Sequence, residues 1–316
     1  MSGTVYIGAA TPFAQITASP IIQECVPMLG YGADQVGSPQ IRNVGTIGGN
    51  VCNGVTSADT APALFAYNAT LALAGESGVR LVPIREFYTG PGKTVRRHEE
   101  VLVAVLIAPE DYRGFSGRYI KYGKREAMEI STLGCACLVK VGHAGEVGSN
   151  CAATADAAGD ASTRAAETNC EQSAGVQEKS AGVQGDSAGV QYKSAGVQGE
   201  SAGVQDESAG VQGDIGGRGR KPGGDLVVTD LRLAFGVAAP TPMRCTETER
   251  KIIGLPVCEE TFALAGELAM EEVQPRSSWR ASREFRLQLV RELTVRALRE
   301  AVEMGRGGAI LVPGCM

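Results

Sequence analysis

The sequence predicts an α+β protein of two domains, in which antiparallel sheets pack against helices. Two observations predict this fold class, and a third concerns the organisation of the chain. Short apolar segments with the alternation of strands recur through the first 110 residues and again further along the chain. Near the C-terminus, residues 283–304 have apolar residues on one face of a helix, as expected for a helix that packs on a sheet. A long array of short repeats interrupts the second domain.

The first domain is expected to cover residues 1–111 and to consist of short strands and turns with a few helical pieces. Its expected strands cover residues 5–9, 69–74, 79–84 and 101–108. Residues 61–66 are expected to form a short helix, because the proline at position 62 is tolerated in the first turn of a helix.

The second domain is expected to cover residues 112–316. Its expected strands cover residues 117–125, 132–141 and 226–237. Its expected helices cover residues 261–271 and 283–304. In the last helix one apolar residue recurs every four positions, and charged residues fill the other faces. The recurring residues are Phe285, Leu289, Leu293, Ala297 and Ala301, and Gly305 is a typical helix stop.

Residues 142–224 form an insertion of low complexity in the second domain. Within it the unit SAGVQ recurs every seven residues from Ser173 to Ser208. A period of seven suggests a coiled coil, but each unit contains a glycine, which costs about 1 kcal/mol in a helix. Its only apolar residues are alanine and valine, so we expect a disordered insertion in place of a short hairpin turn. A small β-solenoid or a partner-binding repeat is the alternative.

Composition excludes several classes of protein. A net charge of −5 and a pI near 5.3 argue against a nucleic-acid partner, which would need a basic face. No apolar run reaches the length of a membrane span, and the N-terminus lacks the features of a signal peptide. We therefore expect a soluble, cytoplasmic protein.

The cysteines are expected to be reduced thiols. There are nine, an odd number scattered along a long chain, and no four of them have iron–sulfur spacing. Cys135 and Cys137 alternate in an apolar run, which places both on one face of a strand as buried thiols.

The motif most indicative of function is Thr46-Ile47-Gly48-Gly49-Asn50. Glycine lets a backbone approach a ligand closely, and successive N–H groups bind anions. Thr56, Ser57 and Asp59 add polar groups shortly afterwards. These residue types suit the phosphates and ribose hydroxyls of a nucleotide, and an ordinary glycine-rich turn between strands is the alternative.

Other motifs are excluded. Gly92-Lys93-Thr94 resembles the end of a P-loop, but Phe87 stands where that motif needs its first glycine. Gly30-Tyr31-Gly32 lacks the third glycine of a Rossmann fingerprint. His98 and His143 lie in charged or loop-like segments without partners for a triad or a zinc site.

Arginines gather before the last helix. Arg276, Trp279, Arg280 and Arg283 form either the capping region of the helix with surface arginines or a subunit contact.

Five separated blocks of this sequence together resemble the FAD-binding subunits of molybdenum hydroxylases, most of all the flavoprotein subunits of bacterial xanthine dehydrogenases. The blocks are residues 7–13, 42–59, 87–93, 233–242 and 275–282. The resemblance implies the second half of a PCMH-type (vanillyl-alcohol-oxidase-like) FAD-binding domain. A small sheet with helices, of the CO dehydrogenase flavoprotein C-terminal type, would follow it.

The resemblance also implies which residues contact FAD. They are Thr46, Ile47, Gly48, Gly49, Asn50, Asp59, Leu102, Lys121 and Ile130. Asp59 would accept hydrogen bonds from polyol or ribose hydroxyls, and Leu102 would supply backbone and apolar contact. Lys121 would place a positive charge near the flavin, and Ile130 would cover one face of its ring. No side chain is expected to be catalytic or to bind a metal, because the flavin carries the chemistry.

The resemblance implies a chain of electron transfer across subunits. A molybdenum cofactor in one partner subunit would oxidise a purine, the [2Fe-2S] clusters of a second would relay electrons, and FAD on this chain would pass them to NAD+. A flavin-free assembly subunit is one alternative. A flavoprotein subunit for another substrate, such as an aromatic acid or carbon monoxide, is the other.

The sequence departs from the family pattern at its N-terminus. The family has a further N-terminal subdomain with a glycine-rich loop of the G-G-T-[DE] kind that grips the FAD pyrophosphate, and this chain begins after it. Truncation, a separate chain that supplies the missing half, or loss of tight FAD binding would each explain this. We expect the chain alone to bind FAD weakly or not at all.

Overall fold

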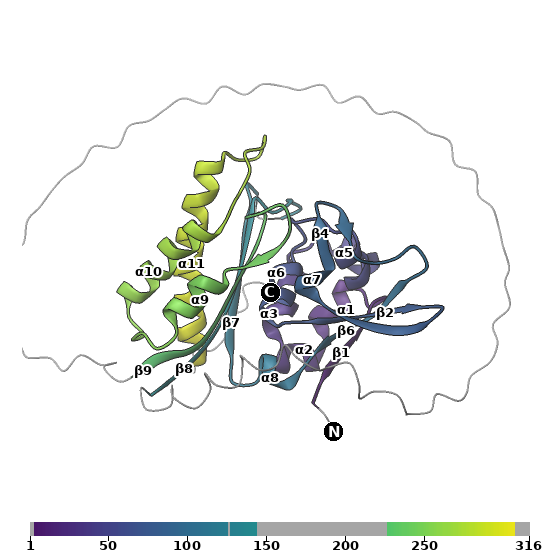
Figure 1. Ribbon diagram of the computed structural model, residues 1–316, viewed down its shortest axis with the longest axis horizontal. Helices are drawn as coiled ribbons and strands as arrows, with labels where there is room; N and C mark the ends of the chain where they lie inside the picture. Colours follow the sequence, from purple (N-terminus) through teal and green to yellow (C-terminus); the bar gives the residue numbers. More distant parts are fainter. Residues whose placement is uncertain (1–2, 126, 144–225, 307–316) are drawn as a thin grey trace, which may run out of the picture. The chain divides into compact units, whose positions relative to one another are not determined.

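Two antiparallel sheets of four strands and a two-stranded ribbon organise the computed structural model, which describes residues 3–125, 127–143 and 226–306 (Figure 1). In spatial order, the first sheet consists of β1 (Val5–Gly8), β6 (Val101–Ile107), β2 (Thr70–Gly75) and β3 (Gly78–Pro83). The second consists of β10 (Met243–Arg244), β9 (Leu226–Gly236), β8 (Leu133–His143) and β7 (Ser116–Tyr122). The ribbon pairs β4 (Tyr88–Gly90) with β5 (Lys93–Thr94). The predicted α+β class is confirmed.

The predicted strands are present with small shifts of their ends. The exception is the strand predicted over residues 117–125, which ends at Tyr122. The predicted short helix is α6 (Ala61–Ala66), and the two predicted C-terminal helices are α10 (Glu259–Glu272) and α11 (Arg283–Gly305). Two one-turn helices, α7 (Ile84–Phe87) and α8 (Pro109–Tyr112), follow strands β3 and β6.

The expectation of mostly strands and turns in the first domain was wrong between residues 13 and 52. That stretch forms the short helices α1 (Phe13–Ala18), α2 (Pro20–Cys25), α3 (Pro27–Asp34), α4 (Pro39–Val44) and α5 (Ile47–Cys52). Prolines open three of them, and hydroxyl side chains cap two. Each is six to eight residues long, too short to display a helical apolar period.

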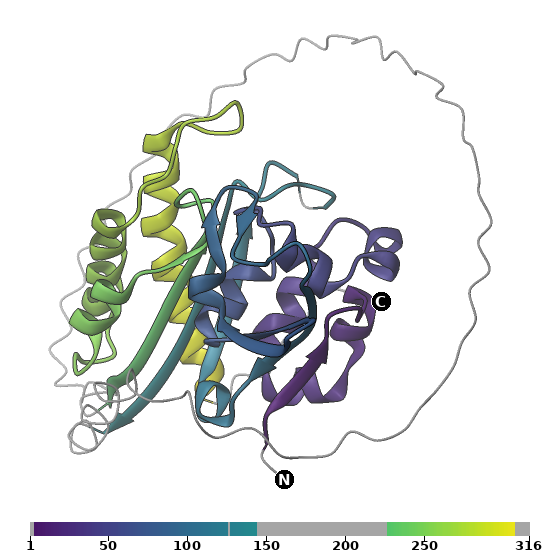
Figure 2. The same ribbon diagram turned by 45° about the vertical axis from the view of Figure 1, so that its right-hand side comes forward.

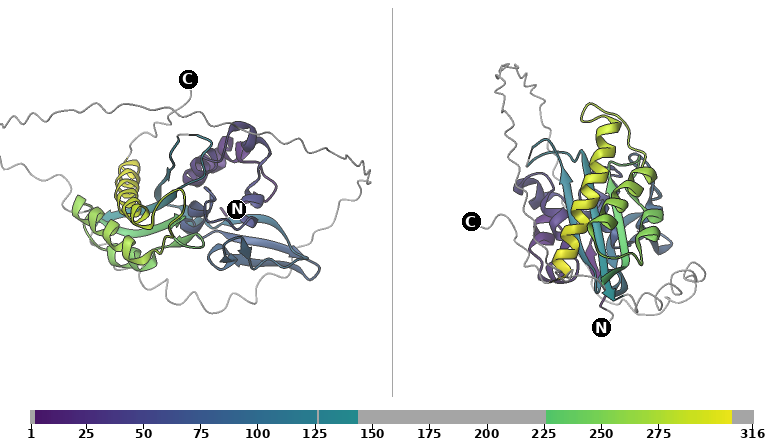
Figure 3. Two further views of the ribbon diagram at one scale, coloured as in Figure 1. Left: turned by 90° about the horizontal axis from the view of Figure 1, so that it is seen from above. Right: turned by 90° about the vertical axis from the view of Figure 1, so that its left-hand side faces the viewer.

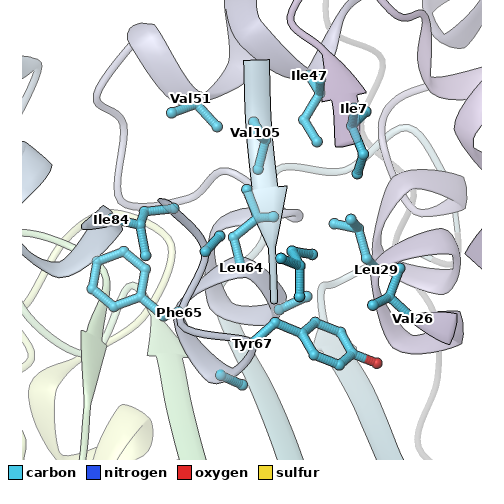
Figure 4. Close-up of a cluster of buried hydrophobic side chains, with 14 of the residues drawn as sticks. Ile7, Val26, Leu29, Ile47, Val51, Leu64, Phe65, Tyr67, Ile84 and Val105 are labelled. Atoms are coloured by element: carbon cyan, nitrogen blue, oxygen red, sulfur yellow. The ribbon is translucent and has the colours of Figure 1, made fainter. Parts of the chain in front are cut away.

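These helices share one buried core with the first sheet, and α5 packs directly against β6. Figure 4 shows Ile47 and Val51, from α5, beside Val105 on β6. Ile7 and Leu64 complete this part of the core, and all of these side chains are buried. The core therefore fixes the position of the helix that begins in the glycine motif.

The second sheet is buried on both faces. On one face Tyr119, Ala136 and Leu138 join the core that also contains the buried side chains of the first sheet. On the other face Cys135 and Cys137 join a second core beneath α9 (Thr246–Ile252), α10 and α11. The right-hand panel of Figure 3 shows α11 crossing the strands, with α10 beside it. The prediction that both thiols are buried on one face is confirmed.

The last helix packs as its period predicts, with one exception. Leu289, Leu293, Ala297 and Ala301 are buried, whereas Phe285, in its first turn, is 39% exposed. No helix in the described part of the chain is both long and apolar enough to cross a membrane.

The strands on either side of the repeat insertion pair with each other, with His143 opposite Leu226. The predicted hairpin is therefore confirmed. The SAGVQ repeats lie outside the described residues.

Polar contacts join the second sheet to the first domain. Arg232 on β9 donates to the Asp111 carboxylate at 2.9 Å and to the Ala66 carbonyl at 3.3 Å. Arg244 on β10 donates to Asn68 and forms an ion pair of 2.6 Å with Glu249, in which both side chains are largely buried. Buried charges are tolerated where they are paired in this way.

Candidate functional site

The glycine motif begins a helix and is not a loop. Thr46 is the N-cap of α5, and its Oγ1 accepts a hydrogen bond from the Gly49 N–H at 3.2 Å. Ile47 is fully buried in the core. The alternative of an ordinary turn between strands is therefore also wrong, because the motif is the first turn of a packed helix.

Gly48 is required by packing. A Cβ at this position would lie 2.7 Å from both the carbonyl oxygen and the Cβ of Ala9. Its N–H donates to that carbonyl at 2.8 Å. The end of strand β1 thus meets the helix backbone directly, and only glycine fits between them.

The backbone N–H groups of the motif are largely used inside the protein. The N–H of Ile47 donates to Thr11 O at 3.2 Å, and that of Asn50 donates to Thr46 O at 3.0 Å. The expected cradle of successive free N–H groups is therefore not formed at these positions. Residues 9–11 supply the acceptors for Ile47 and Gly48, because the helix start packs closely on them, and the acceptor for Asn50 lies within the helix start itself.

Gly49 is the exposed member of the motif. A Cβ there would meet only the Thr46 hydroxyl within 4 Å, at 3.2 Å. Thr46 and Asn50, on either side, are half-buried. The Asn50 Oδ1 accepts from the Thr60 hydroxyl at 2.7 Å, which leaves the amide nitrogen to donate to a ligand. A bare Cα between two polar side chains is suited to close approach by a polar cofactor.

Asp59 and Lys121 form a buried ion pair beside this surface. The Lys121 Nζ lies 2.8 Å from Asp59 Oδ2 and also donates to the Gln35 carbonyl at 2.9 Å. The Tyr119 hydroxyl donates to Asp59 Oδ1 at 3.0 Å. Burial raises the pKa of Asp59, and the Lys121 charge and the hydrogen bonds from Lys121 and Tyr119 oppose that rise. A carboxylate has about four acceptor positions, so Asp59 keeps acceptor capacity for a hydroxyl.

The last two residues predicted to contact FAD, Leu102 and Ile130, differ in how exposed they are. The Leu102 side chain is buried in the core of the first domain, so its main chain on β6 is the part left for a ligand. Ile130 is 53% exposed in the segment between β7 and β8. The structure thus brings the motif close to Asp59 through the Asn50–Thr60 bond, and Asp59 to Lys121. The contacts of all nine residues with FAD stay predictions.

A strained turn holds the segment before Asp59. The Thr56 Oγ1 donates to Ala239 O at 3.2 Å, and Val237 N donates to Thr56 O at 3.1 Å. A Cβ at Gly236 would lie 2.9 Å from Thr56 O. Val237 has a φ of 67°, a conformation that is unfavourable for a β-branched residue. The sequence analysis included Val237 in the block of residues 233–242 that resembles the family, but assigned it no role of its own.

No group of three or more His, Cys, Asp or Glu side chains that could hold a metal ion occurs among the described residues. What the site offers is an open glycine, hydroxyl and amide donors, and a buried charge pair. These groups fit a nucleotide cofactor with polyol hydroxyls.

Two family models match this chain. Residues 1–109 match the FAD binding domain in molybdopterin dehydrogenase, and residues 220–301 match the CO dehydrogenase flavoprotein C-terminal domain. The candidate site takes its motif from the first match and Lys121 from the chain between the two.

Curated relatives match over different lengths. The putative xanthine dehydrogenase FAD-binding subunit of Escherichia coli K12 is 34% identical over 96% of this chain and 76% of the relative. The nicotinate dehydrogenase FAD-subunit of Eubacterium barkeri is 37% identical, but over 45% of this chain and 49% of its own length.

Solved structures share the fold. Carbon monoxide dehydrogenase from Hydrogenophaga pseudoflava matches with a TM-score of 0.65 and 23% identity, over 96% of this chain and 76% of that one. Quinoline 2-oxidoreductase from Pseudomonas putida 86 matches with a TM-score of 0.66 and 20% identity, over 96% and 77%. At these identities the likeness concerns the fold alone.

Proposed function

The chain belongs to the family of FAD-binding subunits of xanthine dehydrogenases and related molybdenum hydroxylases, and we propose that it is the flavoprotein subunit of a xanthine dehydrogenase-type complex that uses NAD+ as electron acceptor. The proposal of the xanthine type rests on the extent of similarity. The Escherichia coli xanthine dehydrogenase relative matches nearly the whole chain, whereas the nicotinate dehydrogenase relative matches less than half of it.

The exposed Gly49 is the observation that carries the proposal of FAD binding. It interrupts the half-buried polar surface of Thr46 and Asn50 with a residue that has no side chain. FAD, when bound, supplies the redox chemistry by accepting electrons singly and releasing them as a pair. The protein supplies position and electrostatics.

Each residue of the site would have a separate role. Thr46 and Asn50 would donate to oxygen atoms of the cofactor, and Gly49 would permit their close approach. Asp59 would accept from a cofactor hydroxyl while it fixes the Lys121 ammonium 2.8 Å away. The positive charge of Lys121 would stabilise electron density that develops on the flavin. Ile130 would cover one face of the ring and limit the access of water.

The proposed partners are the molybdenum-binding subunit and the iron–sulfur subunit of the same complex. The molybdenum subunit would oxidise the substrate, a purine, and the iron–sulfur subunit would carry the electrons to this chain. The substrate is therefore chosen outside the residues described here.

A second function is favoured by one observation. The N–H groups of Ile47, Gly48 and Asn50 donate to protein acceptors, so they are not free to hold a pyrophosphate. A flavin-free assembly subunit would need no such groups. Whether the assembled complex contains flavin distinguishes the two functions.

The test compares two glycine substitutions in this chain, which is co-expressed with its partner subunits and purified as the complex. Gly49→Leu should leave the complex assembled and remove its flavin absorbance and its oxidation of NADH by an artificial acceptor. Gly90→Leu is the matched control, because a Cβ there would also meet little, its nearest neighbour being Lys93 at 3.9 Å. Full flavin content in folded Gly49→Leu would refute the assignment of the motif. A wild-type complex that assembles without flavin would establish the assembly function.

A further inference from the structure

A tight turn before α11 displays the only tryptophan of the chain. We call residues 278–281 the Trp279 turn. The Ser278 N–H donates to the Ala281 carbonyl at 2.9 Å, which places Trp279 and Arg280 at the tip. Trp279 is 78% exposed, and the Arg280 guanidinium lies 4.2 Å from the centre of its ring. This stacking holds the two side chains together on the surface.

A buried arginine anchors the turn from below. Arg286, on α11, is 2% exposed and donates to the Ser278 hydroxyl at 2.8 Å and to the Thr132 carbonyl at 3.3 Å. It also donates to the carbonyl of Arg276. These hydrogen bonds tie the turn, through Ser278, and the preceding residue Arg276 to α11 and to Thr132. A preorganised turn loses little further entropy when it binds a partner.

The turn lies at the end of the second sheet that also carries Lys121. Arg286 donates to Thr132 O, and Thr132 N donates in turn to the carbonyl of Tyr122, the residue after Lys121, at 2.8 Å. The rings of Tyr122 and Phe285 are in contact, with their centres 5.7 Å apart. Figure 2 shows the loop before α11 and the loop between β7 and β8 at the same end of the sheet. The second loop exposes Met128 and Ile130.

The charge of this surface is opposite in sign to that of the whole chain. Residues 276–285 contain three arginines and a single acidic residue, Glu284, whereas the chain as a whole has a net charge of −5. Arginine and tryptophan are the residue types most enriched where binding energy concentrates in protein interfaces. A cationic surface with a protruding aromatic ring fits an acidic protein surface that contains an apolar pocket.

We propose that the Trp279 turn is the docking site for an acidic surface of the iron–sulfur subunit. This proposal rests on the proposed function, because it places the electron donor at the end of the sheet to which Lys121, and with it the flavin, is assigned. Trp279 would fill an apolar pocket of the partner, and the Arg276, Arg280 and Arg283 guanidinium groups would face its carboxylates.

The first test uses the single tryptophan as a reporter. The full chain is produced with 5-fluorotryptophan, which gives one fluorine resonance for position 279. Addition of the unlabelled complex of the two partner subunits should shift and broaden that resonance. A resonance unchanged in the assembled complex would overturn the proposal. A photo-reactive amino acid at position 279 should cross-link to the iron–sulfur subunit, and cross-linking to the molybdenum subunit alone would also overturn it.

The second test measures affinity and flavin content together. Trp279→Ala with Arg280→Glu should weaken association with the partner subunits about 100-fold or more, because the change removes two side chains of the types that dominate interface hot spots, whose effects do not simply add. Trp279→Ala alone, which carries no charge reversal that could disturb folding, should weaken association at least tenfold. Arg250→Glu, at a side chain that is 71% exposed on α9, is the control and should change affinity little. Affinity of the double variant within threefold of wild type would refute the docking site.

Flavin content separates this proposal from the proposed function. The free double variant should bind added FAD with the same affinity as the free wild-type chain, because neither residue belongs to the candidate FAD site. Loss of association with that affinity unchanged supports the docking site. Absence of flavin from the assembled wild-type complex would refute the proposed function and leave the association result to be judged by itself.

Discussion

The Lys121 ammonium lies 2.8 Å from the Asp59 carboxylate, and this buried pair joins the second sheet to the segment that follows the glycine motif. Both side chains are 9% exposed. Tyr119, on the same strand as Lys121, donates to the second carboxylate oxygen. The pair therefore acts as a structural link as well as a charge within the candidate site.

Removal of one partner of this pair should be costly. Lys121→Ala leaves the Asp59 carboxylate buried without its counter-ion, and such changes cost about 3–5 kcal/mol. Asp59→Leu combined with Lys121→Met removes both charges and should be considerably more stable than the single variant. Urea unfolding of wild type, the single variants Asp59→Leu and Lys121→Met, and the double variant gives the coupling. A loss below 1 kcal/mol for Lys121→Ala would show that the pair contributes little to the fold.

The two glycines of the motif should respond in opposite ways. Gly48→Ala places a methyl group 2.7 Å from the Ala9 carbonyl oxygen, and overpacking of this kind costs about 1–3 kcal/mol. Gly49→Ala should be neutral or stabilising by up to about 1 kcal/mol, because alanine is favoured in a helix and the site is open. Thermal melts of the two variants check this. Equal effects would contradict the assignment of Gly48 to packing.

The sequence predicts the long elements of this protein better than the short ones. The apolar period of α11, from Phe285 to Ala301 in a helix of 23 residues, identifies its buried face, with Phe285 as the exception. Helices such as α5 are a single turn or two, and their formation depends on capping by Thr46 and on burial of Ile47, which no local pattern displays. The glycine motif could be recognised from the sequence. That Gly48 is required by packing and Gly49 is exposed follows only from the distance of each to its neighbours, such as Ala9 for Gly48. Contacts between residues far apart, such as Asp59 with Lys121, are fixed only by the packing of the two sheets.

Glu100 should make stability depend on pH in the acid range. It accepts from Arg80 at 2.6 and 2.8 Å and from the Arg97 N–H at 2.7 Å. The hydrogen bonds from Arg80, followed by that from Arg97, lower the pKa of Glu100 from its usual 4.5 to about 2. A lowered pKa in the folded state means that the stabilisation is complete above pH 4.5 and is lost as the pH falls towards 2.

Glu100→Gln tests the predicted direction of this dependence of stability on pH. The variant should melt below wild type at pH 7, and the difference should shrink as the pH is lowered from 5 to 2. Melts followed by circular dichroism at a series of pH values measure it. A difference that grows in acid would contradict the assigned direction of the shift.

Val237→Gly should stabilise the protein, against the usual effect of glycine. Val237 has a φ of 67°, and strain of this kind costs about 1–3 kcal/mol. Glycine relieves it at an entropic cost of about 1 kcal/mol, so we expect a gain of up to about 2 kcal/mol. Ala238→Gly, at the next and fully buried position, lacks that relief and should be destabilising by about 1 kcal/mol. Similar losses in both variants would show that Val237 is not strained.

Deletion of residues 145–222 should leave the folded part of the chain at least as stable as before. The ends of β8 and β9 already pair at His143 and Leu226, so the deletion leaves a short loop of Ala144, Gly223, Gly224 and Asp225 between them. Shortening the loop from about 80 residues to a few reduces the entropy of closure by roughly 2–3 kcal/mol. The repeats contain only alanine and valine as regular apolar residues, too little for a core that would offset this gain.

The melting temperature and the flavin content of the assembled complex should therefore stay constant or rise. A variant with the same residues in scrambled order should match wild type. A drop of several degrees on deletion or scrambling would show that the repeats fold and stabilise the protein.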